Sequence, residues 1–189
     1  PGARWSDVRE AMREGDIGGM ATSLGEAIGE SAGGAAVKIV EPALGKPEGY
    51  VQRQITGWID RYERAITPDA PGWEPVKAWL QDKMPADHHK PGIIHNDYRF
   101  DNVILGLNNP MEIIGVLDWE MTTLGDPLMD LGNTLAYWIE ATDPQPMQLI
   151  RKQPSNAPGM LTRQQFVEHY AERAGIRIDN VDYYYTYGL

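Results

Sequence analysis

The sequence predicts an α+β fold, a mainly helical domain with one small antiparallel β-hairpin. Apolar residues recur at helical spacing on both sides of the middle of the chain, whereas short runs rich in β-branched residues occur between residues 91 and 118. The 189 residues are 42% hydrophobic and 23% charged, which is ordinary for one globular domain and excludes wholesale disorder.

Helical spacing dominates the first half of the chain. The expected helices there cover residues 5–14, about 20–30, 49–66 and 73–84. The clearest is 49–66, which has one wide apolar face, and we expect the aromatic residues of the last two helices to be core. The Gly- and Pro-rich segment from residue 31 is expected to be a loop with a short extended piece at 37–40, and its poor fit to its neighbours suggests a missing stretch near 33–42.

The middle of the chain has the signals of short strands. Three runs, 91–95, 102–106 and 112–118, are β-like. Turn residues at 107–110 separate the last two runs, which predicts a hairpin between them.

The last third of the sequence returns to helical signals. Asp126 is expected to cap a helix over 126–141, with Pro127 at its first position. A Pro-rich linker is expected over 143–158, and Thr162 is expected to open the last helix. The tyrosines within residues 183–187 are expected to pack or to lie at an edge.

Composition excludes several classes of protein. The formal charge of −10, without Lys/Arg clusters, argues against a nucleic-acid or anionic-membrane binder. The absence of cysteine excludes disulfides, thiol catalysis and Cys-type zinc sites, and it fits a reducing compartment. No apolar run approaches the length of a membrane span, and the N-terminus lacks the layout of a signal peptide. We therefore expect a cytoplasmic protein.

Polar residues with candidate catalytic roles gather between positions 95 and 130. A hairpin brings the start of its first strand near the end of its second, so Asn102 and Asp118 are expected to be neighbours, with Asp97 just upstream. An amide oxygen and a carboxylate are ligands that Mg²⁺ prefers. A second carboxylate away from the metal could accept a proton from an attacking hydroxyl.

The pattern His-x-Asp-x-x-x-x-Asn with a downstream Asp resembles the catalytic half of protein-kinase-like enzymes. Residues 93–105 (IIHNDYRFDNVIL) and 115–131 (GVLDWEMTTLGDPLMDL) are similar to the aminoglycoside phosphotransferase family. Residues 45–65 (GKPEGYVQRQITGWIDRYERA) are similar to its acyl-CoA-dehydrogenase-linked kinase branch. The resemblance implies a kinase-like C-terminal lobe over residues 1–189, with the site on the hairpin. Because the sequence has no G-x-G-x-x-G and no preceding sheet pattern, the N-terminal nucleotide-binding lobe is expected to be absent from it.

The same resemblance implies roles for individual residues. Asp97 would be the catalytic base, and His95 would support the loop by hydrogen bonding. Asn102 and Asp118 would hold Mg²⁺ and, through it, the phosphates of ATP. Arg99 is expected to hold the loop or to meet a substrate group.

Two further residues are expected to act structurally. Asp130 would tether the catalytic loop, as Asp126 would cap its helix. Asn96 stands where the family usually has Gly, which is tolerable because Asn adopts positive φ more readily than most residues.

The expected function is ATP- and Mg²⁺-dependent transfer of the γ-phosphoryl group to a hydroxyl of a small molecule. The acceptor stays open between an aminoglycoside, a choline-like alcohol and a hydroxyacyl thioester, and its pocket is expected between helices 49–84 and the C-terminal helices. Two alternatives remain: a catalytically incomplete lobe that binds a substrate or partner, and a metal-dependent phosphohydrolase. No nucleic-acid or membrane partner is expected, and the oligomeric state is left open.

Overall fold

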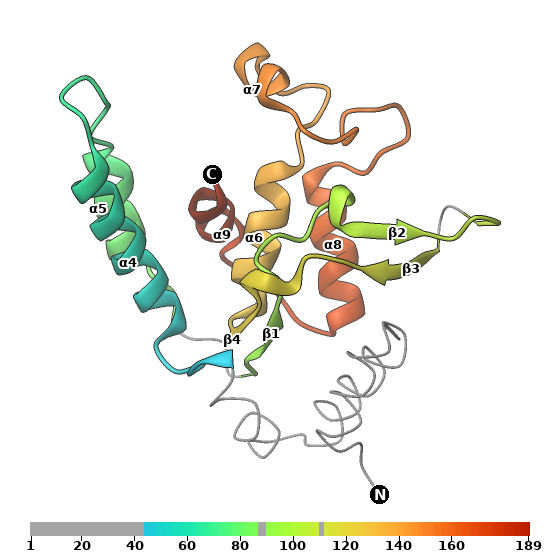
Figure 1. Ribbon diagram of the computed structural model, residues 1–189, viewed down its shortest axis with the longest axis horizontal. Helices are drawn as coiled ribbons and strands as arrows, with labels where there is room; N and C mark the ends of the chain where they lie inside the picture. Colours follow the sequence, from blue (N-terminus) through green and yellow to red (C-terminus); the bar gives the residue numbers. More distant parts are fainter. Residues whose placement is uncertain (1–43, 87–89, 110–111) are drawn as a thin grey trace, which may run out of the picture.

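The computed structural model describes residues 44–86, 90–109 and 112–189, which form a mainly helical body with two small antiparallel sheets (Figure 1). The expected helices over 5–14 and 20–30, the extended piece at 37–40 and the suggested gap near 33–42 lie outside the described residues. The elements in chain order are α4 (Tyr50–Ala65), α5 (Glu74–Asp82), β1 (Gly92–Ile94), the 3₁₀ turn η1 (Phe100–Asn102), β2 (Val103–Leu105), β3 (Ile113–Val116), η2 (Trp119–Met121), β4 (Thr123–Gly125), α6 (Pro127–Tyr137), α7 (Gln145–Ile150), α8 (Arg163–Ala174) and α9 (Val181–Gly188).

Helices α4 and α5 form an antiparallel pair (Figure 1), which contacts the rest of the body through α9 and through Tyr50, whose ring lies against Gly125 of β4. Val51 and Ile55 of α4 are buried, as the apolar stripe predicted. The expectation that the aromatic residues of these helices are core is wrong in part, because Trp58 is 51% exposed. Trp79 is partly exposed and stacks on Tyr183 of α9 with ring centroids 5.8 Å apart. An aromatic stripe on a helix thus need not be covered along its whole length.

The predicted hairpin is present as β2 and β3, which project from the body (Figure 1). Val103 pairs with Val116, and a register shift follows Ile104. The first β-like run does not join this hairpin. It forms β1 and pairs with β4, which the sequence did not predict, because a three-residue strand pairing across some thirty residues leaves no local periodicity.

Helix α6 is the centre of the core and packs closely against α9. It begins as predicted, since the Asp126 side chain accepts the N–H of Leu128 at 2.8 Å. A Cβ at Gly132 would lie 2.1 Å from the carbonyl oxygen of Tyr184, so only glycine allows this approach of the two helices. The helix ends at Tyr137, whereas the sequence predicted that it would continue to residue 141.

Two helices were not predicted in the C-terminal third. The expected linker over 143–158 contains α7, and the tyrosine cluster forms α9 with Tyr183 and Tyr184 buried, which confirms that the cluster packs. Thr162 opens α8, as the sequence indicated, and it forms a reciprocal capping box with Gln165 that was not predicted.

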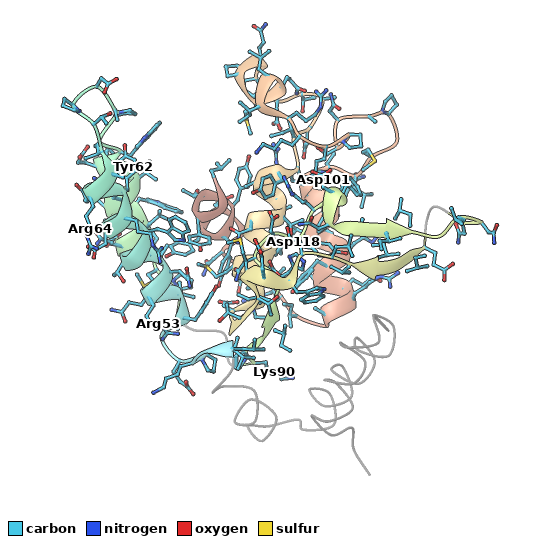
Figure 2. The ribbon with its side chains drawn as sticks, in the orientation of Figure 1. Arg53, Tyr62, Arg64, Lys90, Asp101 and Asp118 are labelled. Carbon is cyan, nitrogen blue, oxygen red and sulfur yellow. The ribbon has the colours of Figure 1, made fainter. Side chains whose placement is uncertain are left out.

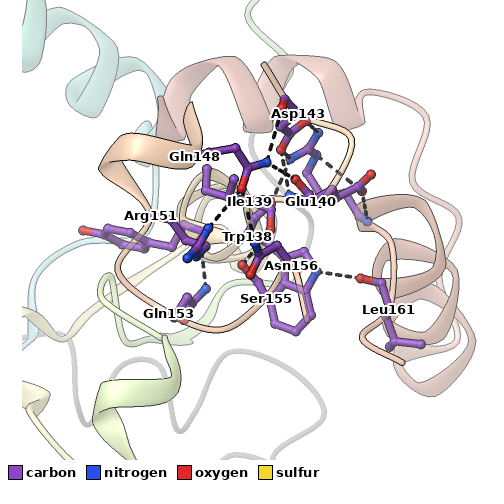
Figure 3. Close-up of polar contacts among 12 residues, drawn as sticks. Trp138, Ile139, Glu140, Asp143, Gln148, Arg151, Gln153, Ser155, Asn156 and Leu161 are labelled. Carbon is purple, nitrogen blue, oxygen red and sulfur yellow. Dashed lines mark hydrogen bonds and ion pairs between the residues drawn. The ribbon is translucent and has the colours of Figure 1, made fainter. Parts of the chain in front are cut away.

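A polar network fixes the chain between α6 and α8 (Figure 3). Ser155 donates to the carbonyl of Ile139 at 2.9 Å, and Trp138 Nε1 donates to the carbonyl of Leu161 at 2.8 Å. Side-chain bonds to the main chain therefore organise a segment that has little regular structure of its own. No helix in the described ranges is both long enough and apolar enough to cross a membrane.

Candidate functional site

Asp130 on α6 holds the start of the loop between β1 and η1. Its two carboxylate oxygens accept the main-chain N–H groups of His95 and Asn96, each at 2.8 Å. Burial raises the pKa of Asp130, while these two donors act in the opposite direction. Asn96 has φ +66°, so the backbone conformation expected at the usual glycine position is adopted by an asparagine. Two expectations from the sequence are thus confirmed: Asp130 tethers this loop, and Asn96 adopts a positive φ.

His95 connects this loop to the end of the hairpin. Its side chain is buried, and Nε2 lies 2.7 Å from the carbonyl oxygen of Leu117. Its Nδ1 accepts the main-chain N–H of Asp97 at 3.2 Å. Because Nδ1 accepts a bond, Nε2 is the ring nitrogen that donates to the carbonyl of Leu117. His95 therefore supports the loop by hydrogen bonding, next to the residue that precedes Asp118.

Asp97 and Asn102 face each other across the loop. The Asn102 side-chain amide donates to the carbonyl oxygen of Asp97 at 2.8 Å and to its Oδ2 at 2.9 Å. Both bonds use the amide nitrogen, so the amide oxygen is the atom of Asn102 that a cation could bind. These bonds also fix the orientation of the Asp97 carboxylate.

The hairpin brings Asp118 to the same place. The N–H of Leu117 donates to the carbonyl oxygen of Asn102 at 2.8 Å, which puts Asp118 one residue beyond a direct backbone bond to Asn102. Figure 2 shows Asp118 at the base of the hairpin. Its φ of +63° is uncommon for a residue other than glycine, and such conformations cluster at functional sites.

The donor set of this site suits a hard cation with few protein ligands. In the part of the chain that the structure describes, no three His, Cys, Asp or Glu side chains come together to bind a metal. The Asn102 amide oxygen and the Asp118 carboxylate are two oxygen atoms of this site that could bind such a cation. Mg²⁺ takes one or two carboxylates and fills its other positions with water or substrate phosphate, whereas structural Zn²⁺ requires four N or S ligands.

Arg99 lies near Asp97 but makes no close hydrogen bond to its carboxylate. Its Nε is 3.5 Å from Asp97 Oδ2, and its Nη1 is 3.6 Å from Asp101 Oδ2. Its Cζ lies over the ring of Tyr137, 5.3 Å from the centroid. Burial, and next the negative charge of Asp97, raise the pKa of the Tyr137 hydroxyl.

Sequence reasoning missed Tyr137 and Gln153. The signal for Tyr137 is its position on α6, seven residues after Asp130 and so on the same face of the helix. Gln153 is 5% exposed, accepts the N–H of Phe100 at 3.1 Å and donates to the carbonyl of Tyr137 at 3.0 Å. No local pattern marks Gln153, because both of its partners are distant in the sequence.

A cavity of about 740 Å³ lies between α4–α5 and the α6–α9 pair, where the acceptor pocket was expected. Asn96 and Tyr137 form part of its wall, so it opens beside Asp97. Aromatic rings of Trp58 and Tyr187 also line it. Among the described residues that line it there is no Asp or Glu, and Arg61 is the one Lys or Arg.

The chain is similar to known proteins over most of its length. The profile described as the phosphotransferase enzyme family matches residues 1–166. Human acyl-CoA dehydrogenase family member 11 is 33% identical over 131 residues, which are 68% of this chain and 16% of that protein. Mouse acyl-CoA dehydrogenase family member 10 is 32% identical over 149 residues, 78% of this chain and 14% of that protein.

A solved structure has the same fold. A putative aminoglycoside phosphotransferase from Ralstonia eutropha superposes with a TM-score of 0.64 at 30% sequence identity, covering 77% of this chain and 44% of that chain. This chain therefore corresponds to less than half of that protein and to a small part of the dehydrogenase relatives.

Proposed function

The chain belongs to the phosphotransferase enzyme family and has part of its kinase-like α+β fold, and on this basis we propose that it transfers the γ-phosphoryl group of ATP to a hydroxyl of a small molecule. The proposal is carried by the hydrogen bonds between Asn102 and Asp97 and by the backbone bond from Leu117 to Asn102, which places Asp118 next to this pair at the base of the hairpin. A carboxylate beside two oxygen donors is the arrangement that hydroxyl phosphorylation needs.

Each residue has a distinct task in this proposal. The Asp97 carboxylate orients the acceptor hydroxyl and takes its proton, while the Asn102 amide keeps that carboxylate in place. The Asn102 oxygen and the Asp118 carboxylate would hold Mg²⁺. When bound, this ion neutralises negative charge on the phosphates. Positioning by the loop supplies much of the remaining rate enhancement.

The cavity beside Asn96 is the proposed acceptor site. A polycationic acceptor such as an aminoglycoside requires several carboxylates, and the described lining has none. The described lining is mostly aliphatic and aromatic, with a few polar side chains and Arg61 as its one charged side chain, which favours an uncharged or anionic hydroxyl compound. The formal charge of −10 does not contradict this, because the acidic residues lie outside the described lining of the cavity.

The main alternative is a lobe that binds a substrate or partner without nucleotide. It is favoured by the absence of a G-x-G-x-x-G phosphate-covering motif from the sequence. Nucleotide binding therefore decides between the two functions.

Isothermal titration with Mg²⁺-ATP tests the proposal, first on the 189-residue chain and then on the full-length gene product. We expect the full-length protein to bind, Asp118→Ala to weaken binding at least tenfold, and the exposed Asp60→Ala on α4 to leave it unchanged. No binding to the full-length protein would refute the proposal. Equal binding by Asp118→Ala would refute the role of this site. Release of ADP on addition of candidate hydroxyl acceptors then distinguishes a kinase from a phosphohydrolase, which needs no acceptor.

A further inference from the structure

Arg99 and Tyr137 form a stacked pair in which Arg99 lies beside Asp97 and Tyr137 belongs to the wall of the cavity. The guanidinium lies 5.3 Å from the ring centroid, and Tyr137 lines the cavity. Arg99 Nε is buried, and it finds no hydrogen-bond partner among the residues that the structure describes. Its nearest carboxylate oxygen, on Asp97, is 3.5 Å away, which is longer than an ordinary charge-assisted hydrogen bond.

A second Arg–Tyr pair in the same chain has an arginine whose donors are bonded to nearby groups, and it serves as a comparison. Arg163 lies 5.2 Å from the ring centroid of Tyr185, a similar stacking distance. Its guanidinium, however, makes two bonds of 2.6 Å to the Asp143 carboxylate and one of 2.8 Å to the carbonyl of Trp138. Stacking alone therefore does not explain the loose contacts of Arg99. Within the described ranges the Nε of Arg99 has no hydrogen-bond partner, and its Nη1 lies 3.6 Å from the nearest carboxylate oxygen, on Asp101.

Other contacts fix Tyr137 in place. Its carbonyl accepts a bond of 3.0 Å from the buried Gln153, and it ends α6, on the face that Asp130 uses to hold the catalytic loop. The negative charge of Asp97 contributes to the raised pKa of its hydroxyl, which indicates that the phenol and this carboxylate are close. One rigid side chain is thus next to the proposed base, to a cation with unused donors and to the cavity.

We propose that Tyr137 is a positioning residue that presents Arg99 to an oxygen of the phosphoryl group on the acceptor, so that the pair forms a phosphomonoester site beside Asp97. This inference rests on the proposed function, whose product is a phosphomonoester. A phosphomonoester is an anion with several acceptor oxygens, and a planar guanidinium can donate to two of them at once. The anion would approach the part of the Arg99 side chain that is exposed, since Nε itself is buried.

The test is direct binding of inorganic phosphate and of ethyl phosphate to the full-length gene product, without Mg²⁺ or ATP, followed by ³¹P NMR. Tyr137→Phe keeps the ring and should bind within twofold of the unaltered protein. Tyr137→Leu removes the ring and should weaken binding at least fivefold, and so should Arg99→Lys, because an ammonium has no planar fork. The matched controls, Tyr185→Leu in the second pair and the exposed Arg177→Lys, should bind within twofold.

Three results would overturn the proposal: no saturable binding to the unaltered protein, equal binding by Tyr137→Leu, or an equal loss in Tyr185→Leu. Thermal unfolding of each variant establishes that it is folded, and Tyr137→Phe serves in place of Tyr137→Leu if the latter unfolds, since a loss in Tyr137→Phe also contradicts a role of the ring. Titration of the same proteins with Mg²⁺-ATP keeps the two ideas separate. Phosphate binding that depends on Tyr137 without ATP binding would refute the kinase function alone, and the reverse result would refute the phosphomonoester site alone.

Discussion

Arg163 binds the carboxylate of Asp143 through two parallel bonds of 2.6 Å, and this pair joins the turn after α6 to the start of α8 (Figure 3). The Asp143 side chain is 9% exposed, so solvent screens the pair only in part. The main-chain N–H of Glu140 also donates to Asp143, at 2.8 Å. The segment that contains α7 is therefore fixed at its first turn by one bidentate ion pair.

Replacing Arg163 by lysine should lower the free energy of unfolding by about 1 to 2 kcal/mol, because an ammonium cannot make both bonds. Urea unfolding at neutral pH measures the change. The same substitution at Arg64, whose ion pair with Asp60 is exposed, should change the free energy by less than about 0.5 kcal/mol. Equal effects at the two positions would contradict a special contribution from the Asp143 pair.

The stabilisation by Asp143 should depend on pH. The Arg163 hydrogen bond holds the pKa of Asp143 below its usual range, although burial opposes this in part. A carboxyl with a lower pKa in the folded than in the unfolded state stabilises the fold above the unfolded value, about 3.9, and loses this contribution as the pH falls through the folded value. The difference in unfolding free energy between the unaltered protein and Asp143→Asn should therefore be largest near pH 7 and shrink below about pH 4. Urea unfolding across this range tests it, and a difference that stays constant would be evidence against the mechanism.

Asn96 should be harder to replace by alanine than by glycine. Its φ of +66° suits glycine at no steric cost, whereas a Cβ without the asparagine amide is strained there. Both variants lose the bonds of the Asn96 side chain to Tyr50 and to the carbonyl of Met121. The difference in stability between the two variants therefore measures the cost of a positive φ for a residue with a Cβ. Asn96→Ala should be less stable than Asn96→Gly by about 1 kcal/mol in thermal or urea unfolding. Equal stability would show that the loop can adopt another conformation.

The parts of the fold that the sequence predicted depend on local chemistry. The Asp126 cap, the helix start at Thr162 and the β2–β3 hairpin each involve residues a few positions apart, so local sequence alone indicates them. The candidate site followed in the same way, because Asp97 and Asn102 share one loop and the hairpin turn brings Asp118 to them. The Asn96 conformation was predicted from the residue type together with the family pattern.

The parts that were missed depend on contacts between distant residues. Strand β4 is stabilised by pairing with β1, and α9 packs against α6 at Gly132. Both contacts join residues that are far apart in the sequence. Tyr137 was missed for a related reason: a tyrosine at the end of an apolar helix looks like a core residue until its neighbours Asp97 and Arg99 are known. Local periodicity carries no record of such neighbours.

Gln153 offers the sharpest test of how the α7 segment affects the site. Its side chain satisfies two main-chain groups at once, the N–H of Phe100 in the catalytic loop and the carbonyl of Tyr137. Gln153→Leu has a similar size and leaves both groups without this partner, so the free energy of unfolding should fall by about 2 kcal/mol. Hydrogen exchange at the amide of Phe100 should become faster by at least tenfold, because its protecting bond is gone.

Gln153→Glu separates the two contacts. A carboxylate can still accept the N–H of Phe100, but it has no proton to donate to the carbonyl of Tyr137. Slow exchange should therefore be retained at Phe100, whereas phosphate binding at the Arg99–Tyr137 pair should weaken if Gln153 holds Tyr137 in place. Gln164→Leu, on the exposed face of α8, is the control and should alter none of these measurements. Unchanged exchange at Phe100 in Gln153→Leu would mean that the loop is held without help from the α7 segment, by its other contacts such as the bonds to Asp130.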